Sequence, residues 1–245
     1  MGFRTIFIAL CRRELGRRYG LVLIGWLLLG AGAALSHAWL SAGQPLHTPV
    51  VRLLGDFPVT LATVLAFVAA FQLIVRTAED RLHGWLPGWC GSGGRRDGYV
   101  SALYLATGGA MVAVFGSSVA GFAITRAALG DGARLVRTPV QFLVGVLLIG
   151  GVGAYGLVLA TLLQRVAAAL LLGALLFIAP VIAGAVLAVT HDLPGLPASA
   201  RFWILHLPSP WPVSSGTGLV RQISYIAVAV AVSAWVARYR IGRSA

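Results

Sequence analysis

Six long apolar runs constrain this chain more strongly than any other feature of its sequence. Each run contains 16 to 26 residues, and a helix needs about 20 apolar residues to cross the roughly 30 Å hydrocarbon layer of a bilayer. The runs cover residues 21–40, 59–75, 100–125, 138–163, 166–189 and 222–237. The sequence therefore predicts an all-α integral membrane protein with six transmembrane helices, arranged as a single transmembrane domain over residues 1–245.

The charge composition separates this chain from soluble proteins and from nucleotide hydrolases. Charged residues make up only 11% of the 245 residues, and all 19 basic residues are arginine; soluble domains are nearer a quarter charged. A chain without lysine lacks the phosphate-loop lysine of a nucleotide hydrolase, so we expect it not to be an enzyme. The net charge of +12 suits arginines beside membrane lipid better than a nucleic-acid partner.

The arginines also predict the orientation in the membrane. If both chain ends lie inside, thirteen arginines fall on the cytoplasmic side and six on the other. Cytoplasmic segments carry such an excess of basic residues, so we predict N-in and C-in topology, in a bacterial cytoplasmic (inner) membrane. The longest outer segment is 190–221, within which residues 198–207 could form a short interfacial helix.

The first 20 residues predict an elbow helix, which lies on the inner membrane surface before it bends into the first span. At 100° per residue, four apolar side chains share one face and four arginines come after them. These are Phe3, Ile6, Phe7 and Leu10, followed by Arg12, Arg13, Arg17 and Arg18. Glu14 falls near the apolar side. The alternative is an ordinary positive flank of the first span.

The predicted spans contain no acidic residue and no arginine. Because intramembrane ionisable groups mark ion paths and proton relays, their absence argues against an ion-coupled carrier or a proton pump. The polar side chains inside the spans include Gln72, Tyr104, Ser117, Ser118, Gln141 and Tyr155. We expect them to form hydrogen bonds between helices, the alternative being that some line a path for an apolar or amphipathic cargo.

The glycines of the fourth run match a nucleotide-binding fingerprint by letter only. Gly151, Gly153 and Gly156 have the G-x-G-x-x-G spacing, but that motif requires a preceding strand. Inside an apolar run, small residues favour close helix packing instead. In the fifth run, Pro180 predicts a helix kink.

The segment 76–99 between the second and third runs is the strongest candidate for a functional site. It combines charges, exposed aromatic residues and a glycine turn. The candidate residues are Glu79, Asp80, Arg81, His83, Gly84, Trp85, Leu86 and Trp89. A charged helix with aromatic side chains on a short cytoplasmic loop suits docking into a groove on a partner. The alternative is a loop whose tryptophans lie against the membrane surface.

This layout resembles the ABC-2-type permeases, the membrane subunits of a class of ATP-binding cassette exporters. The resemblance is most specific in the segment that in this family forms a coupling helix, an acidic-basic pair followed by Gly-Thr-Leu, a proline and basic residues. The similar residues here are Asp80 and Arg81, then Gly84, Trp85 and Leu86, then Pro87, and finally Arg95 and Arg96. Trp85 stands where the family has threonine, and Gly91 to Gly94 interrupt the stretch before the arginines.

The resemblance implies a function that this chain performs only with partners. It implies a second permease, in a homodimer or heterodimer that encloses the translocation path. It also implies separate ATP-binding subunits that dock on residues 76–96 and hold the ATP and Mg²⁺, while this chain binds no cofactor or metal itself.

Two other functions remain open from the residues alone. The chain could be a non-transporting scaffold or assembly subunit of a larger complex, in which the 76–99 segment recruits something other than an ATPase. It could also be a haem-handling membrane protein if its outer histidines converge. Those histidines are His37, His47, His191 and His206.

Overall fold

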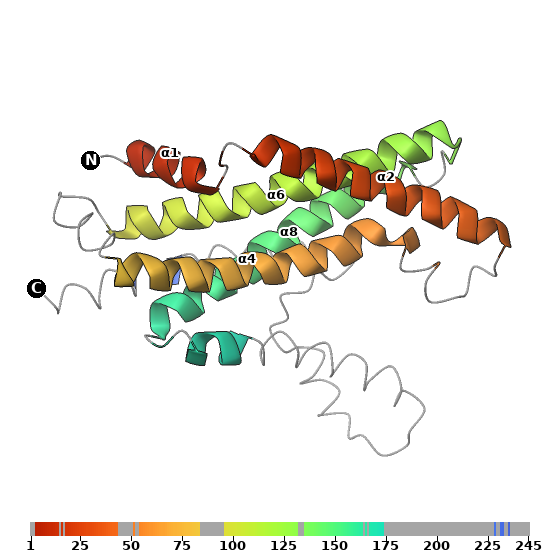
Figure 1. Ribbon diagram of the computed structural model, residues 1–245. Helices are drawn as coiled ribbons and strands as arrows, with labels where there is room; N and C mark the ends of the chain where they lie inside the picture. Colours follow the sequence, from red (N-terminus) through yellow and green to blue (C-terminus); the bar gives the residue numbers. More distant parts are fainter. Residues whose placement is uncertain are drawn as a thin grey trace, which may run out of the picture.

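In the part of the chain that the computed structural model describes, one short helix and four long ones carry labels in Figure 1, and residues 167–173 form a further helical stretch. The described residues are 3–14, 16, 18–43, 51, 54–83, 96–131, 135–163, 165, 167–173, 228, 231–232 and 235. The helices are α1 (Phe3–Glu14), α2 (Tyr19–Gly43), α4 (Phe57–Leu82), α6 (Arg96–Ala128) and α8 (Thr138–Leu162). The described part of the chain is all-helical, as its sequence predicts.

Four of these helices are long and apolar enough to cross a membrane. The qualifying stretches are Tyr19–Ala42, Phe57–Leu82, Gly98–Ala128 and Thr138–Leu162. They coincide with the first four predicted spans, so the chain has the character of a transmembrane protein. Only residues 167–173 of the fifth predicted span and four residues of the sixth are described, all of them helical. Pro180 and the segment 190–221 lie outside the described residues.

Helices α4 and α8 begin where the sequence changes from polar to apolar. Both α4 and α8 have a proline in the first turn, Pro58 and Pro139, where the missing N–H removes no helical hydrogen bond. Beyond these turns the helices are rich in leucine, valine and alanine. Their backbone polar groups are satisfied within each helix, as a lipid environment requires.

The four long helices pack as two parallel pairs. In the first pair, Tyr19 donates a hydrogen bond to the Ala110 carbonyl (2.6 Å), and Ser117 donates one to the Leu23 carbonyl (2.6 Å). These contacts advance along α2 and α6 in the same direction, so the two helices run parallel. They lie side by side in Figure 1.

The second pair is α4 with α8. A Cβ atom added at Gly145 would lie 2.9 Å from Ala62 Cβ, and one added at Gly156 would lie 2.7 Å from the Ala70 carbonyl oxygen. The order of these contacts makes α4 and α8 parallel as well. Helix α6 contacts α1, α4 and α8 in addition to α2, so it is the central element of the bundle.

The glycines serve close helix packing, as the fourth run predicts. At Gly156 the backbone of α8 lies so near that of α4 that no side chain fits between them, whereas a Cβ at Gly153 would make only ordinary contacts of 3.6 Å or more. In the same way, Gly30 of α2 lies against the Ser118 carbonyl of α6, and Gly121 of α6 lies against the Leu27 carbonyl of α2. Small residues thus bring backbones together in both pairs.

Large apolar side chains fill the space that the glycines leave. Phe115, Leu148 and Ile149 are fully buried between α4, α6 and α8. Tyr104 donates a hydrogen bond to the Gly150 carbonyl (2.8 Å), so Tyr104 joins α6 to α8 as Ser117 joins α6 to α2, and for these two residues the predicted hydrogen bonds between helices are confirmed. Gln72 Oε1 and Ser118 Oγ, by contrast, are buried without a hydrogen-bond partner among the described residues.

Candidate functional site

Helix α4 extends beyond the predicted end of the second span. The apolar run ends at Val75, but α4 continues to Leu82. Residues 76–82 are therefore the last two turns of a long helix rather than a separate segment. Opposite charges three residues apart favour this extension, because neighbouring side chains on a helix surface attract each other; Arg76 Nη1 lies 2.9 Å from Glu79 Oε2.

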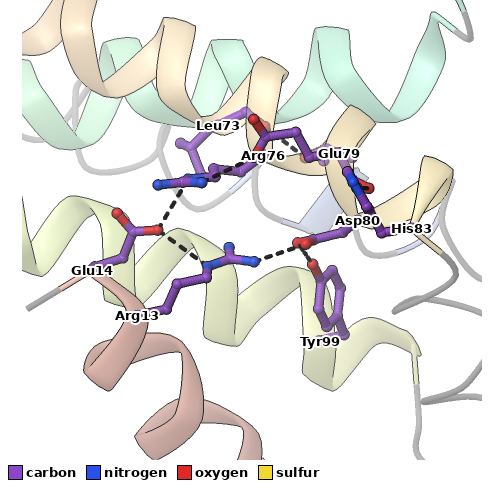
Figure 2. A network of polar contacts seen from close by, with 9 residues as sticks. Arg13, Glu14, Leu73, Arg76, Glu79, Asp80, His83 and Tyr99 are labelled. Atoms are coloured by element: carbon purple, nitrogen blue, oxygen red, sulfur yellow. Dashed lines mark hydrogen bonds and ion pairs between the residues drawn. The ribbon is translucent and has the colours of Figure 1, made fainter. Parts of the chain in front are cut away.

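A cluster of charged side chains connects the end of α4 to α1 and α6 (Figure 2). The charged cluster consists of Arg13, Glu14, Arg76, Glu79, Asp80 and Tyr99. Its centre is Asp80, a buried carboxylate. Arg13 of α1 donates to Asp80 Oδ1 over 2.7 Å, and the Tyr99 hydroxyl of α6 donates to Asp80 Oδ2. One carboxylate thus joins three helices.

Glu14 forms the second link between α1 and α4. Its Oε1 lies 3.5 Å from Arg13 Nε and 3.4 Å from Arg76 Nε, and its side chain is buried. The sequence places Glu14 near the apolar side of α1, and the structure gives the reason. This side of the helix faces the rest of the chain, where two arginines compensate the buried charge.

The cluster is electrically balanced. Arg81 lies next to it and donates to the Ala160 carbonyl of α8 (2.8 Å). Counted with Arg81, the cluster holds three cationic and three anionic side chains. A buried charge is costly unless it is paired, so balance at this end allows ionised groups to lie between helices that are otherwise apolar.

Apolar packing holds α1 in the position that the charges require. Ile6 and Leu10 are buried and pack with Leu73, Tyr99 and Leu103. Of the other apolar residues on this face, Phe7 is half-buried and Phe3 is exposed, and their rings stack 6.1 Å apart. Part of the predicted membrane-facing surface of α1 is therefore a contact with α4 and α6.

The arginines predicted to follow the apolar face of α1 lie in two environments, the exposed surface and the charged cluster. Arg12 and Arg18 are exposed, whereas Arg13 belongs to the charged cluster. Arg17 lies outside the described residues. The role of α1 as an elbow on a membrane surface stays a prediction.

The predicted docking residues also occupy different positions. Glu79 and Arg81 are half-buried and His83 is exposed, but Asp80 is buried within the chain. Gly84, Trp85, Leu86 and Trp89 lie outside the described residues. The structure adds Leu82, whose side chain is 83% exposed at the tip of α4. A leucine that follows four charged positions in a helix is the only sequence signal that could have indicated it.

Sequence reasoning missed the partners of Asp80. Arg13 and Asp80 are 67 residues apart, and Tyr99 is 19 residues from Asp80. No periodicity joins positions on three different helices.

Cys11 adjoins the charged cluster and reports on its electrostatics. Burial raises the pKa of the Cys11 thiol above its ordinary value of 9.0, and the neighbouring Glu14 carboxylate raises that pKa further. Both effects disfavour the thiolate. The thiol is free, so its reactivity can be measured directly.

The outer histidines are represented by His37 alone. It is buried near the end of α2 that lies away from the charged cluster. His47, His191 and His206 lie outside the described residues, and among the residues described, histidine, cysteine, aspartate and glutamate side chains form no group of three that could hold a metal ion. A haem site built on these histidines stays a prediction.

Comparisons with known proteins give no family or function for this geometry. No protein-family model matches the chain, and no curated protein matches it.

Proposed function

We propose that this chain is the permease subunit of an ATP-driven ABC exporter of the ABC-2 type. In this proposal two permeases form the translocation path, and separate ATP-binding subunits dock at the end of the bundle that carries the charged cluster. The observation that carries the proposal is the buried link from Asp80 to Arg13 and Tyr99, because it couples a helix end at the docking surface to two other helices.

The contacts supply a route for mechanical coupling. A partner that pushes on the tip of α4 moves Asp80, and Asp80 is bound to α1 and α6. Arg81 extends the connection to α8 through the Ala160 carbonyl. A displacement at one surface therefore reaches α1, α6 and α8 without passing through the apolar core.

The distribution of arginines supports a cytoplasmic position for this end. Eight described arginines lie near it and two lie near the opposite end. The first group is Arg4, Arg12, Arg13, Arg18, Arg76, Arg81, Arg96 and Arg165, and the second is Arg126 and Arg137. By the positive-inside tendency the charged cluster faces the cytoplasm, where ATP-binding subunits would be found.

The exposed residues at the tip of α4 provide the docking surface. Leu82 is 83% exposed and His83 is exposed beside it. Apolar side chains that fill a partner's pocket dominate many interfaces. Asp80 is unsuitable as a docking probe, because substituting it would disturb the contacts within the chain.

The test is an affinity purification of the tagged chain from native membranes in mild detergent, with mass spectrometry of the proteins that accompany it. We expect a stoichiometric ATPase with a phosphate loop, lost in Leu82→Asp. The matched control is Val136→Asp, since Val136 is 77% exposed at the opposite end of the bundle. Both variants are expected to insert into the membrane normally.

The outcomes separate the alternatives. An ATPase that remains bound to Leu82→Asp as it does to the unchanged chain would contradict docking at this end. A reproducible complex without an ATPase would favour the scaffold function. Loss of the ATPase in Leu82→Asp alone would support the permease.

A further inference from the structure

A polar cavity lies at the end of the bundle opposite the charged cluster. Its volume is about 340 Å³, at the lower end of the about 300–1,000 Å³ typical of small-molecule sites. Helix α2 and the end of α6 form its walls. The lining residues are Ala34, His37, Ala38, Ser41, Arg126, Leu129 and Asp131.

The cavity presents both signs of charge. The Arg126 side chain is only 3% exposed, and its Nη1 lies 3.0 Å from Asp131 Oδ2. The Asp131 side chain is 36% exposed, so its carboxylate is the more accessible partner. Arg126 is held in place by Phe122, whose ring centroid lies 4.5 Å from the guanidinium carbon.

Two further polar side chains face the same cavity from α2. His37 is buried, and its Nε2 would lie 3.2 Å from a Cβ added at Gly55, so the backbone at Gly55 fixes one side of the ring. Ser41 also lines the cavity, but its hydroxyl donates to the Ala38 carbonyl of its own helix (3.0 Å), so its oxygen can act only as an acceptor there. A guanidinium and an imidazole opposite a carboxylate suit a ligand with an anionic and a cationic group close together.

The position of the cavity suits a lipid rather than a soluble molecule. Trp39 lies between the lining residues Ala38 and Ser41 and is 78% exposed. Tryptophan side chains concentrate at the depth of lipid headgroups. Leu35 is exposed one turn earlier on the same helix, where it can contact an acyl chain.

From these observations we propose that the cavity binds the zwitterionic phosphoethanolamine headgroup of a phospholipid. The phosphate lies against Arg126 and His37, and the ammonium lies against Asp131. The acyl chains extend along the apolar surface of α2. This site does not depend on the proposed ATPase partner, because every residue that forms it belongs to this chain.

The test measures lipid binding to the purified chain in dodecyl maltoside by native mass spectrometry. The probes are dioctanoyl phosphatidylethanolamine, dioctanoyl phosphatidylglycerol and glycerophosphoethanolamine, the headgroup without acyl chains. We expect the unchanged chain to prefer phosphatidylethanolamine over phosphatidylglycerol. Arg126→Gln should weaken binding of both lipids about tenfold or more, since hydrogen bonds to charged groups are among the strongest.

A second variant keeps the test decisive if Arg126→Gln fails to fold. Asp131→Asn removes the more accessible charge and should abolish the preference for phosphatidylethanolamine while phosphatidylglycerol still binds. Arg137→Gln is the control, because it removes an exposed arginine at the same end that does not line the cavity.

Each result then has a defined meaning. Loss of preference in Asp131→Asn, with preference retained in Arg137→Gln, would support the site. Equal binding of the two lipids to the unchanged chain, or an unaltered preference in Asp131→Asn, would overturn it. Displacement of the lipid by an equal concentration of glycerophosphoethanolamine would overturn the lipid assignment in favour of a soluble ligand.

Discussion

The two ends of the helix bundle are held together in different ways. At one end the charged cluster joins Asp80 to Arg13, 67 positions away in the chain, and to Tyr99, 19 positions away, and so connects three helices. At the other end an ion pair joins Arg126 to Asp131, five residues later, and a cavity lies beside it. Long-range charge pairs fix separate helices relative to one another, whereas a local pair fixes only its own turn and leaves room for a ligand.

The largest effect should come from removing the centre of the charged cluster. Asp80→Ala removes the carboxylate that Arg13 and the buried Tyr99 hydroxyl share, although Arg13 keeps its contact with Glu14, and is expected to lower the free energy of unfolding by about 3–5 kcal/mol. Asp131→Ala, the matched change at the other end, should cost less, about 1–3 kcal/mol, because the buried Arg126 guanidinium loses one partner but no link between separate helices is broken. Titration with sodium dodecyl sulfate measures both, and equal losses would mean that the two ends do not differ.

Removing both charges should reverse most of this loss. In Arg13→Met combined with Asp80→Leu no uncompensated charge remains, and such replacements are often neutral or stabilising. The same titration should place the double variant closer to the unchanged chain than Asp80→Ala is. If the double variant were as unstable as Asp80→Ala, the loss of stability would come from lost side-chain packing rather than from an unpaired charge.

The next largest effect should come from the hydroxyl that α6 contributes. Tyr99→Phe removes the donor to Asp80 and should cost about 1.5–3 kcal/mol, the usual range for a hydrogen bond to a charged group. Tyr104→Phe removes a hydroxyl that binds only a carbonyl and should cost about 0.5–1.5 kcal/mol. Unfolding titrations of the two variants would contradict this ranking if Tyr104→Phe were the less stable.

Packing between α4 and α8 can be separated from charge with two glycines. Gly156→Ala forces the two backbones apart and should cost about 1–3 kcal/mol, the range for overpacking, less up to about 1 kcal/mol from the better helix propensity of alanine. Gly153→Ala has room for its methyl group and should be neutral or stabilising. If both were tolerated equally in thermal unfolding, the close approach at Gly156 would be disproved.

The smallest effect should appear in the reactivity of Cys11. Because the pKa of this thiol is raised in the folded chain, less thiolate is present at pH 8 and maleimide should label it more slowly than in the unfolded chain. Glu14→Gln removes one cause of the raised pKa and should speed the labelling. The measurement uses a Cys90→Ser background, and labelling of the folded chain as fast as the unfolded one would contradict it.

The long helices could be predicted from the sequence because their cause is local. A run such as 138–163 is apolar throughout, and a bilayer leaves it few conformations other than a helix. The charges after Val75 predict a charged helix there, but not that its two turns continue α4, because the predicted span ends before the first charged residue. Their stability depends partly on Arg13, which lies far away in the sequence.

The candidate site was only partly predictable for the same reason. Asp80 stands among the predicted docking residues, and that role stays a prediction; its burial depends on Arg13 and Tyr99, which reach it only after three helices have packed. The cavity at the opposite end was not predicted. Arg126 and Asp131 are close in sequence, but nothing in their spacing indicates that Ser41 of α2 lies across from them.

The parallel pairing of the helices has a consequence for how the chain is made. Helices α2 and α4 follow one another in the sequence, but each packs chiefly on a later helix, α2 on α6 and α4 on α8. When a ribosome has delivered only the first two of these helices, the surface of Gly30 on α2 and that of Ala70 on α4 have no partner. The α2–α6 pair can form only once α6 is complete at Ala128, and the α4–α8 pair only once α8 is complete at Leu162, so each of the first two helices is made well before the helix that covers its surface.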